Sequence, residues 1–140
     1  MLHLTKLCVG ISDVAQLRSL QQARLAAGGE LRHRTRSFPR RAAEVVDGGS
    51  LYWVIAGATV VRQRVVDIME DHWEDGSRCA ALLFDADLVA VAARPTRPFQ
   101  GWRYLDPAAA PPDLGASATA TGRDELPDTL RRELEALGLL

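Results

Sequence analysis

The chain has 140 residues, of which 47% are hydrophobic and 25% are charged, and its formal net charge is −1 at pH 7. These values are typical of one globular domain that buries its own core, and they argue against disorder throughout. No apolar run approaches the roughly 20 residues that cross a bilayer, and the two cysteines, Cys8 and Cys79, lie far apart. We expect a single cytoplasmic domain over 1–140, with free thiols and without a bound metal or cofactor.

The first part of the chain carries alternating signals for strands and helices. In chain order, the patterns predict a strand, a helix, a strand and a helix at 3–9, 12–27, 31–37 and 39–46. Ser12 is expected to cap the first helix and Gly28-Gly29 to end it. In the second strand the alternation places Arg32, Arg34 and Arg36 on one face.

The second part of the chain predicts strands in succession. They are expected at 50–56, 58–69, 78–84 and 88–93. Asp75-Gly76 indicates a hairpin turn, and 85–87 is expected to form another turn. The stretch 106–122 is rich in Pro, Ala, Gly and Thr and predicts an extended surface connection. Leucines at helical spacing within 124–140 predict a C-terminal helix that docks on the body.

This order of elements favours the α+β class. Short connections between the later strands favour antiparallel pairing, and no crossover helices separate those strands. We expect a mostly antiparallel curved sheet or a pseudo-barrel, with two or three packed helices.

Charge is distributed unevenly along the chain. Ten of the basic residues lie within 1–64 beside four acidic ones, whereas 65–93 contains seven acidic residues and one Arg. Sixteen of the 17 basic residues are Arg, which binds phosphate with two hydrogen bonds and stacks on planar groups. The candidates for a phosphate-binding surface are Arg32, Arg34, Arg36, Arg40, Arg41, Arg62 and Arg64. The alternative is that these side chains are solvated and partly paired with the acidic residues of 65–93.

The segment 94–105 combines Arg with aromatic residues, Pro and Gly. Unpaired bases stack on exposed aromatic rings and on guanidinium planes. The ligand-binding candidates are Arg97, Gln100, Trp102, Arg103 and Tyr104, together with Tyr52. The alternative is packing, which we expect for Trp53 and Phe99. Adjacent strand residues point to opposite faces, so Tyr52 and Trp53 are not both expected in the core of a one-sided sheet.

Known motifs for nucleophiles, metals and nucleotide loops are missing. The acidic run 70–75 could hold a cation but reads as a solvated turn. Cys8 and His33 could meet on adjacent strands, although a structural role is the simpler interpretation. An enzyme would need a pocket under 94–105, with Arg62, Arg97 or Arg103 holding an anionic substrate and Asp85 or Asp87 as the base.

Four segments together resemble domain-of-unknown-function family 1489, a family of bacterial proteins. The segments are Leu2–Gly10, Asp47–Ile55, Arg62–Arg64 and Arg97–Leu105. The resemblance spans essentially the whole chain and implies no activity. More loosely, the order of elements around Asp47-Gly48-Gly49 is similar to that of PUA-like pseudo-barrels, a fold class that includes RNA-binding modules.

The sequence therefore supports three functional hypotheses. The first is a small binding module for RNA or a phosphorylated nucleotide, using Arg and aromatic side chains. The second is an enzyme that acts on a small anionic substrate. The third is an interaction domain in which the basic and acidic regions dock on another copy or another protein.

Overall fold

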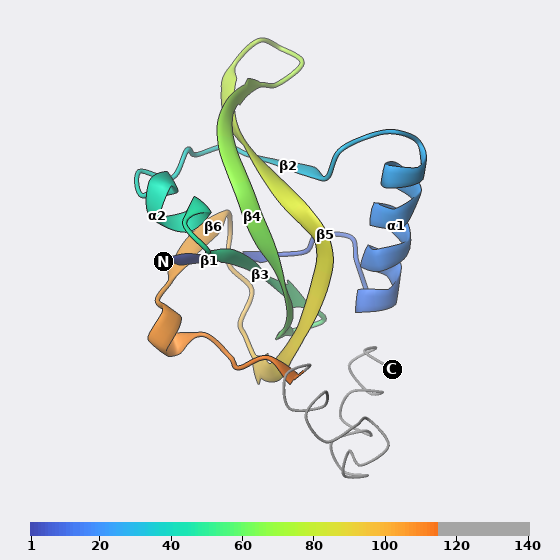
Figure 1. Cartoon of the computed structure of the whole chain (residues 1–140), viewed down its shortest axis with the longest axis vertical. Coiled ribbons are helices and arrows are strands. Elements are labelled where there is room, and N and C mark those ends of the chain that lie inside the picture. The colour runs from blue at the N-terminus through green and yellow to red at the C-terminus, as the bar shows by residue number, and fades with distance from the viewer. Residues whose placement is uncertain (115–140) are drawn as a thin grey trace.

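The structure is a computed structural model that describes residues 1–114, and it forms an α+β fold built on one sheet (Figure 1). The elements are β1 (His3–Leu7), α1 (Val14–Ala26), β2 (Arg32–Thr35), α2 (Ala42–Val46), β3 (Ser50–Ile55), β4 (Ala58–His72), β5 (Arg78–Pro95), β6 (Trp102–Leu105) and the 3₁₀ helix η1 (Pro107–Ala109). The sheet has six strands in the order β2-β5-β4-β3-β1-β6.

The sheet is mixed, curved and open. β1 runs parallel to β3, and the other neighbouring pairs are antiparallel. β2 and β6 are the two edges and do not pair with each other. This confirms the predicted α+β class and the curved, mostly antiparallel sheet.

The helices are shorter than their sequence patterns predicted. Asp13, rather than Ser12, is the N-cap of α1, since its Oδ1 accepts a hydrogen bond from the backbone N–H of Gln16 at 2.7 Å. The Gln16 side chain reaches back to accept from the Ser12 N–H at 2.8 Å, which completes a reciprocal cap. Gly28, with a φ of +82°, follows the end of the helix as expected. α2 begins at Ala42, three residues after the predicted start at Pro39.

β4 and β5 form one long hairpin that rises from the body (Figure 1). Gly76 adopts a φ of +86° in the connecting loop, as the hairpin prediction required. The predicted turn at 85–87 is wrong, because β5 continues through it. Gln63 pairs with Leu88 and Val65 with Phe84, so residues 85–87 stand opposite Arg64 alone. The additional residues are absorbed as a bulge within the hairpin.

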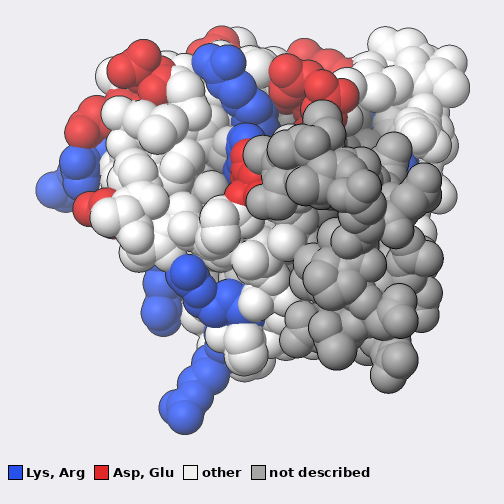
Figure 2. Space-filling view, turned by 60° about the horizontal axis from the view of Figure 1, so that its bottom comes forward, with Lys and Arg blue, Asp and Glu red and all other residues white. Residues whose placement is uncertain are grey.

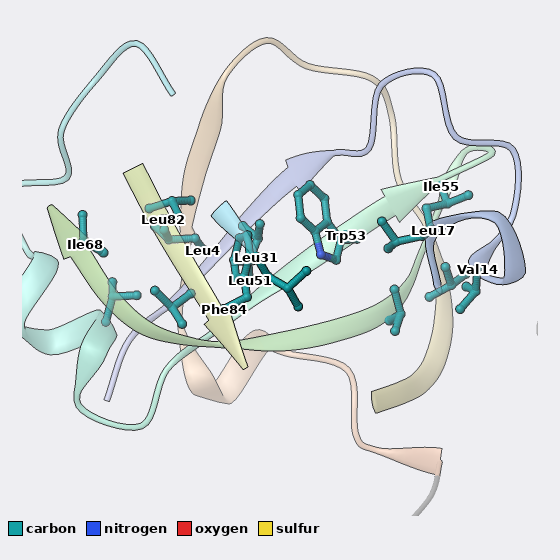
Figure 3. Close-up of a cluster of buried hydrophobic side chains, with 14 of the residues drawn as sticks. Leu4, Val14, Leu17, Leu31, Leu51, Trp53, Ile55, Ile68, Leu82 and Phe84 are labelled. Atoms are coloured by element: carbon teal, nitrogen blue, oxygen red, sulfur yellow. The ribbon is translucent and has the colours of Figure 1, made fainter. Parts of the chain in front are cut away.

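The core lies on one face of the sheet, where side chains from all the central strands meet. Figure 3 shows Trp53 and Leu51 of β3 within this cluster, and Val14 and Leu17 of α1 beside Ile55. Tyr52 lies on the opposite face, which we call the outer face, and is nevertheless only 4% exposed, compared with 3% for Trp53. The expectation that only one of the two would be buried is wrong, since the sheet is covered on both faces.

The cover of the outer face is the segment 106–113, which we call the strap. Asp113 forms an isolated antiparallel bridge with Val91, and the Ala92 N–H donates to the Pro112 carbonyl at 2.8 Å. The first part of the predicted connection 106–122 is therefore fixed to the sheet. The remainder of that connection and the predicted helix at 124–140 lie outside the described residues. Within 1–114, no helix has the length and apolar character needed to cross a membrane.

Candidate functional site

A cleft of about 630 Å³ opens between the ends of the two edge strands. We call it the edge cleft. It is lined by Lys6, Arg34, Thr35, Arg36, Ser37, Gln100, Gly101 and Trp102. These residues come from β1, from β2 with the turn that follows it, and from β6 with the turn that precedes it. Segments far apart in the sequence thus meet at one place.

Side-chain hydrogen bonds hold the two edges near each other. The Trp102 indole Nε1 donates to the Ser37 carbonyl at 2.9 Å, and the Arg41 N–H donates to the Tyr104 hydroxyl at 3.0 Å. The Trp102 and Tyr104 rings meet edge to face, with centroids 4.9 Å apart. Gly101 turns the chain into β6 with a φ of +70°. The Trp102 ring is therefore fixed in orientation but remains partly exposed.

Lys6 supplies a positive charge from inside the cleft. It pairs with Trp102 across β1 and β6, and it shares a strand face with the fully buried Leu4. Burial lowers the pKa of the Lys6 ammonium below its ordinary value. Within 1–114, neither Lys6 nor Arg36 forms a salt bridge. An anion in the cleft would supply a counter-charge to both cations.

Two of the predicted phosphate-binding residues are already paired with acidic residues. Arg32 Nη1 lies 3.0 Å from Asp71 Oδ2 and also contacts Glu30. Arg34 Nη1 lies 3.1 Å from Glu74 Oε1, and its Nε lies 3.4 Å from Asp71. The predicted common face of Arg32 and Arg34 is consistent with these shared contacts. Part of the uneven charge along the sequence is thus neutralised within the chain.

Tyr52, Arg62 and Arg64 lie on the outer face, away from the edge cleft. Arg62 makes two hydrogen bonds of 2.7 Å to Asp113 and one of 3.0 Å to the Ser50 hydroxyl. The Arg62 guanidinium lowers the pKa of Asp113 below its usual range. Tyr52 packs edge to face on His3, with centroids 5.0 Å apart. Arg62 therefore fastens the strap, buried Tyr52 presents no ring for stacking, and Arg64 remains an exposed side chain.

The segment 94–105 divides between the two faces of β6. Arg103 pairs with Thr5, so it points away from the face that carries Trp102 and Lys6. Its guanidinium lies over the Phe99 ring, 4.7 Å from the centroid. Gln100 and Trp102 reach the cleft, whereas Arg97 is exposed and does not line it.

The residues considered for catalysis show no activated arrangement. Cys8 and His33 line one cavity. The expectation that they lie on adjacent strands is wrong, because β5, β4 and β3 lie between β2 and β1 in the sheet. Burial raises the pKa of the Cys8 thiol to about 11 and lowers that of His33 to about 4. These shifts favour a neutral thiol and a neutral imidazole, the opposite of a thiolate–imidazolium pair. Asp85 and Asp87 are exposed on β5.

The acidic run 70–75 serves the hairpin itself. Asp75 accepts two hydrogen bonds from Ser77, and Asp71 accepts from Arg32. In the described part of the chain, no group of three or more His, Cys, Asp or Glu side chains could hold a metal ion.

Lys6 is the charged member of the site that sequence reasoning missed. The signal was its position, because it is the single lysine of the chain and interrupts the apolar alternation of Leu2, Leu4 and Cys8. Thr35 and Ser37 had no comparable signal in the sequence. They line the cleft because the end of β2 lies near β6, which is a contact between distant segments.

The fold and the cleft together define a class: a small α+β protein with an open curved sheet and a basic cleft between the edges of that sheet. A family model of proteins of unknown function, DUF1489, matches residues 4–140. The chain belongs to this family, which confirms the resemblance seen in the sequence. No curated protein and no solved structure matches the chain.

Proposed function

We propose that this protein binds single-stranded nucleic acid, or a phosphorylated nucleotide, in the edge cleft. The observation that carries the proposal is the combination of Lys6 and Arg36, two cations without salt bridges within 1–114, with the partly exposed ring of Trp102. Phosphate would lie against the cations and a base against the indole.

Unpaired nucleotides suit the cleft better than a duplex. Stacking on Trp102 requires a base whose face is free, and paired bases are stacked on one another. The Gln100 amide at the cleft rim can both donate and accept hydrogen bonds at a base edge. Arg34 contributes less than Lys6 because its guanidinium is engaged by Asp71 and Glu74.

The proposal extends to fold type and location. The helix α2 before Asp47-Gly48-Gly49 and the curved sheet after it support a variant of the PUA-like pseudo-barrel. We place the protein in the cytoplasm, where RNA and nucleotides are available. Figure 2 shows a part of the visible surface from which basic side chains project and where acidic ones are lacking, and a surface of this charge attracts anions.

The test is fluorescence anisotropy of a short, labelled, mixed-sequence RNA as the salt concentration rises from about 50 to 200 mM. Wild-type protein is expected to bind at low salt and to weaken as salt increases. Lys6→Gln and Arg36→Gln should each lower the affinity and reduce the magnitude of the salt slope by about 0.7, the value for one phosphate of a single strand.

Arg64→Gln is the matched control, because it removes the same charge from an exposed outer-face residue that does not line the cleft. It should leave the slope nearly unchanged. Thermal unfolding of each variant establishes that the fold is retained. Binding without salt dependence, or an equal effect of Arg64→Gln and Lys6→Gln, would contradict the proposal.

A further inference from the structure

A second cavity, of about 250 Å³, lies between α1 and the sheet. We call it the helix pocket, and its lining shares no residue with the edge cleft. Its walls are largely apolar and include Leu17, Leu31, Trp53 and Phe84. The Trp53 and Phe84 rings are tilted against each other, with centroids 5.8 Å apart. Trp53 is 3% exposed and Phe84 is 8% exposed, so a flat ring in the pocket would meet the small part of each aromatic surface that remains accessible.

The pocket exists because α1 packs on the sheet mainly through its first half. Val14 and Leu17 are buried, whereas Leu20, which also lines the pocket, is 55% exposed. The helix is also tied by a reciprocal amide pair, in which Gln63 Nε2 donates to Gln21 Oε1 at 2.8 Å and Gln21 Nε2 donates back at 3.0 Å. A ligand in the pocket would bury the part of Leu20 that now faces solvent.

The polar groups of the pocket indicate which ligand it can accept. His33 Nε2 is buried and has no hydrogen-bond partner within 1–114. Burial and, to a smaller extent, the charges of Lys6 and Arg24 together lower the pKa of His33 to about 4, so its imidazole is neutral at pH 7. A neutral imidazole nitrogen can complete one hydrogen bond with a ligand.

The charge of the lining is positive. Within 1–114, no Asp or Glu lines the pocket, whereas Arg24 and Arg32 do. Arg32 is occupied by Asp71 and Glu30. Arg24 donates only to the Arg32 carbonyl, at 3.3 Å, and forms no salt bridge with a residue of 1–114. This arrangement disfavours a cationic ligand and favours an anionic one.

We propose that the helix pocket binds a small planar aromatic carboxylate that carries a hydrogen-bonding group on its ring. The ring lies against Trp53 and Phe84, the ring substituent bonds to His33 Nε2, and the carboxylate meets Arg24 at the rim. This is a second site, independent of nucleic-acid binding in the edge cleft.

The experiment is isothermal titration calorimetry of the full chain with indole-3-propionate as the probe. Its amide, indole-3-propionamide, has the same shape without the charge and should bind about tenfold more weakly, because a charge-assisted hydrogen bond is lost. For the same reason, the Arg24→Gln variant should bind indole-3-propionate about tenfold more weakly than the wild-type protein does. Arg18→Gln is the matched control on the same helix, since Arg18 does not line this pocket, and it should change the affinity less than about twofold.

Absence of saturable binding would overturn the proposal, as would equal affinities for the acid and the amide or equal effects of the two arginine variants. Arg36→Gln, which changes the edge cleft but not the lining of the helix pocket, should leave the affinity for indole-3-propionate nearly unchanged. The two proposed sites can therefore fail separately.

Discussion

Lys6 and Arg34 line the same cleft with the same charge, but their surroundings give them different roles. Arg34 is held by Asp71 and Glu74 at the hairpin, and so is mainly structural. Lys6 is desolvated and forms no salt bridge within 1–114, and its lowered pKa records the cost of that position. A partly buried cation that forms no salt bridge within 1–114 is a candidate for function, whereas a paired one is explained by the fold.

The lowered pKa of His33 predicts how the stability of the protein depends on pH. Its pKa is about 4 in the folded protein and near 6.5 in the unfolded chain. Above pH 6.5 both states are neutral at this residue, and between 6.5 and 4 the unfolded chain binds the proton first. As the pH decreases from 6.5 to 4, the free energy of unfolding should therefore fall, and the contribution of His33 to this fall is on the order of 1–3 kcal/mol.

Urea unfolding of wild-type protein and His33→Phe at several pH values between 4.5 and 7.5 measures this contribution. In the His33→Phe variant, the free energy of unfolding should depend much less on pH. Part of the pH dependence should remain, because the pKa of buried His3 is also lowered. His72→Gln, at the exposed end of the hairpin, is the control and should follow the wild type. Parallel curves for wild type and His33→Phe would show that His33 does not cause the slope.

Among the elements, the strap covers the outer face of the sheet. It places Asp113 against Arg62 and buries the outer face around Tyr52. The sheet is therefore packed on both sides at β3, although α1 contributes to one side only. Arg62 is therefore paired with Asp113 and Tyr52 is buried, whereas Lys6 and Arg36 of the edge cleft form no salt bridge within 1–114.

Asp113→Asn should loosen the strap without unfolding the sheet. Loss of the charge-assisted pair leaves Arg62 with the Ser50 hydroxyl and one neutral amide. Amide hydrogen exchange at Ala92, whose N–H is held by Pro112, should become about tenfold faster, which corresponds to about 1.4 kcal/mol less resistance to local opening.

The control for the strap is Glu44→Gln, which makes the same change in the exposed pair between Glu44 and Arg41. It should leave exchange at Ala92 unchanged. If Asp113→Asn leaves that exchange rate unchanged as well, the pair with Arg62 does not hold the strap.

For the whole molecule, sequence patterns predicted the local structures that depend on residues close together in the chain. They identified the hairpin at Gly76 and the strand that carries Arg32 and Arg34. They could not identify contacts between distant segments. The strap over Tyr52 and the approach of Ser37 to Trp102 are such contacts. The residues of the bulge at 85–87 predict a turn, because Asp and Ala there resemble a strand end, and only the pairing with β4 shows that the strand continues.

The measurement that tests the edge cleft most directly is a ¹H–¹⁵N spectrum of the three tryptophan indoles during titration with a short single-stranded RNA. Trp102 lies in the cleft, Trp53 in the helix pocket and Trp73 near the hairpin loop, so each reports on a different place. We expect the Trp102 signal to shift saturably while those of Trp53 and Trp73 stay in place. An unmoved Trp102 signal in the presence of saturating RNA would contradict the assignment of the site.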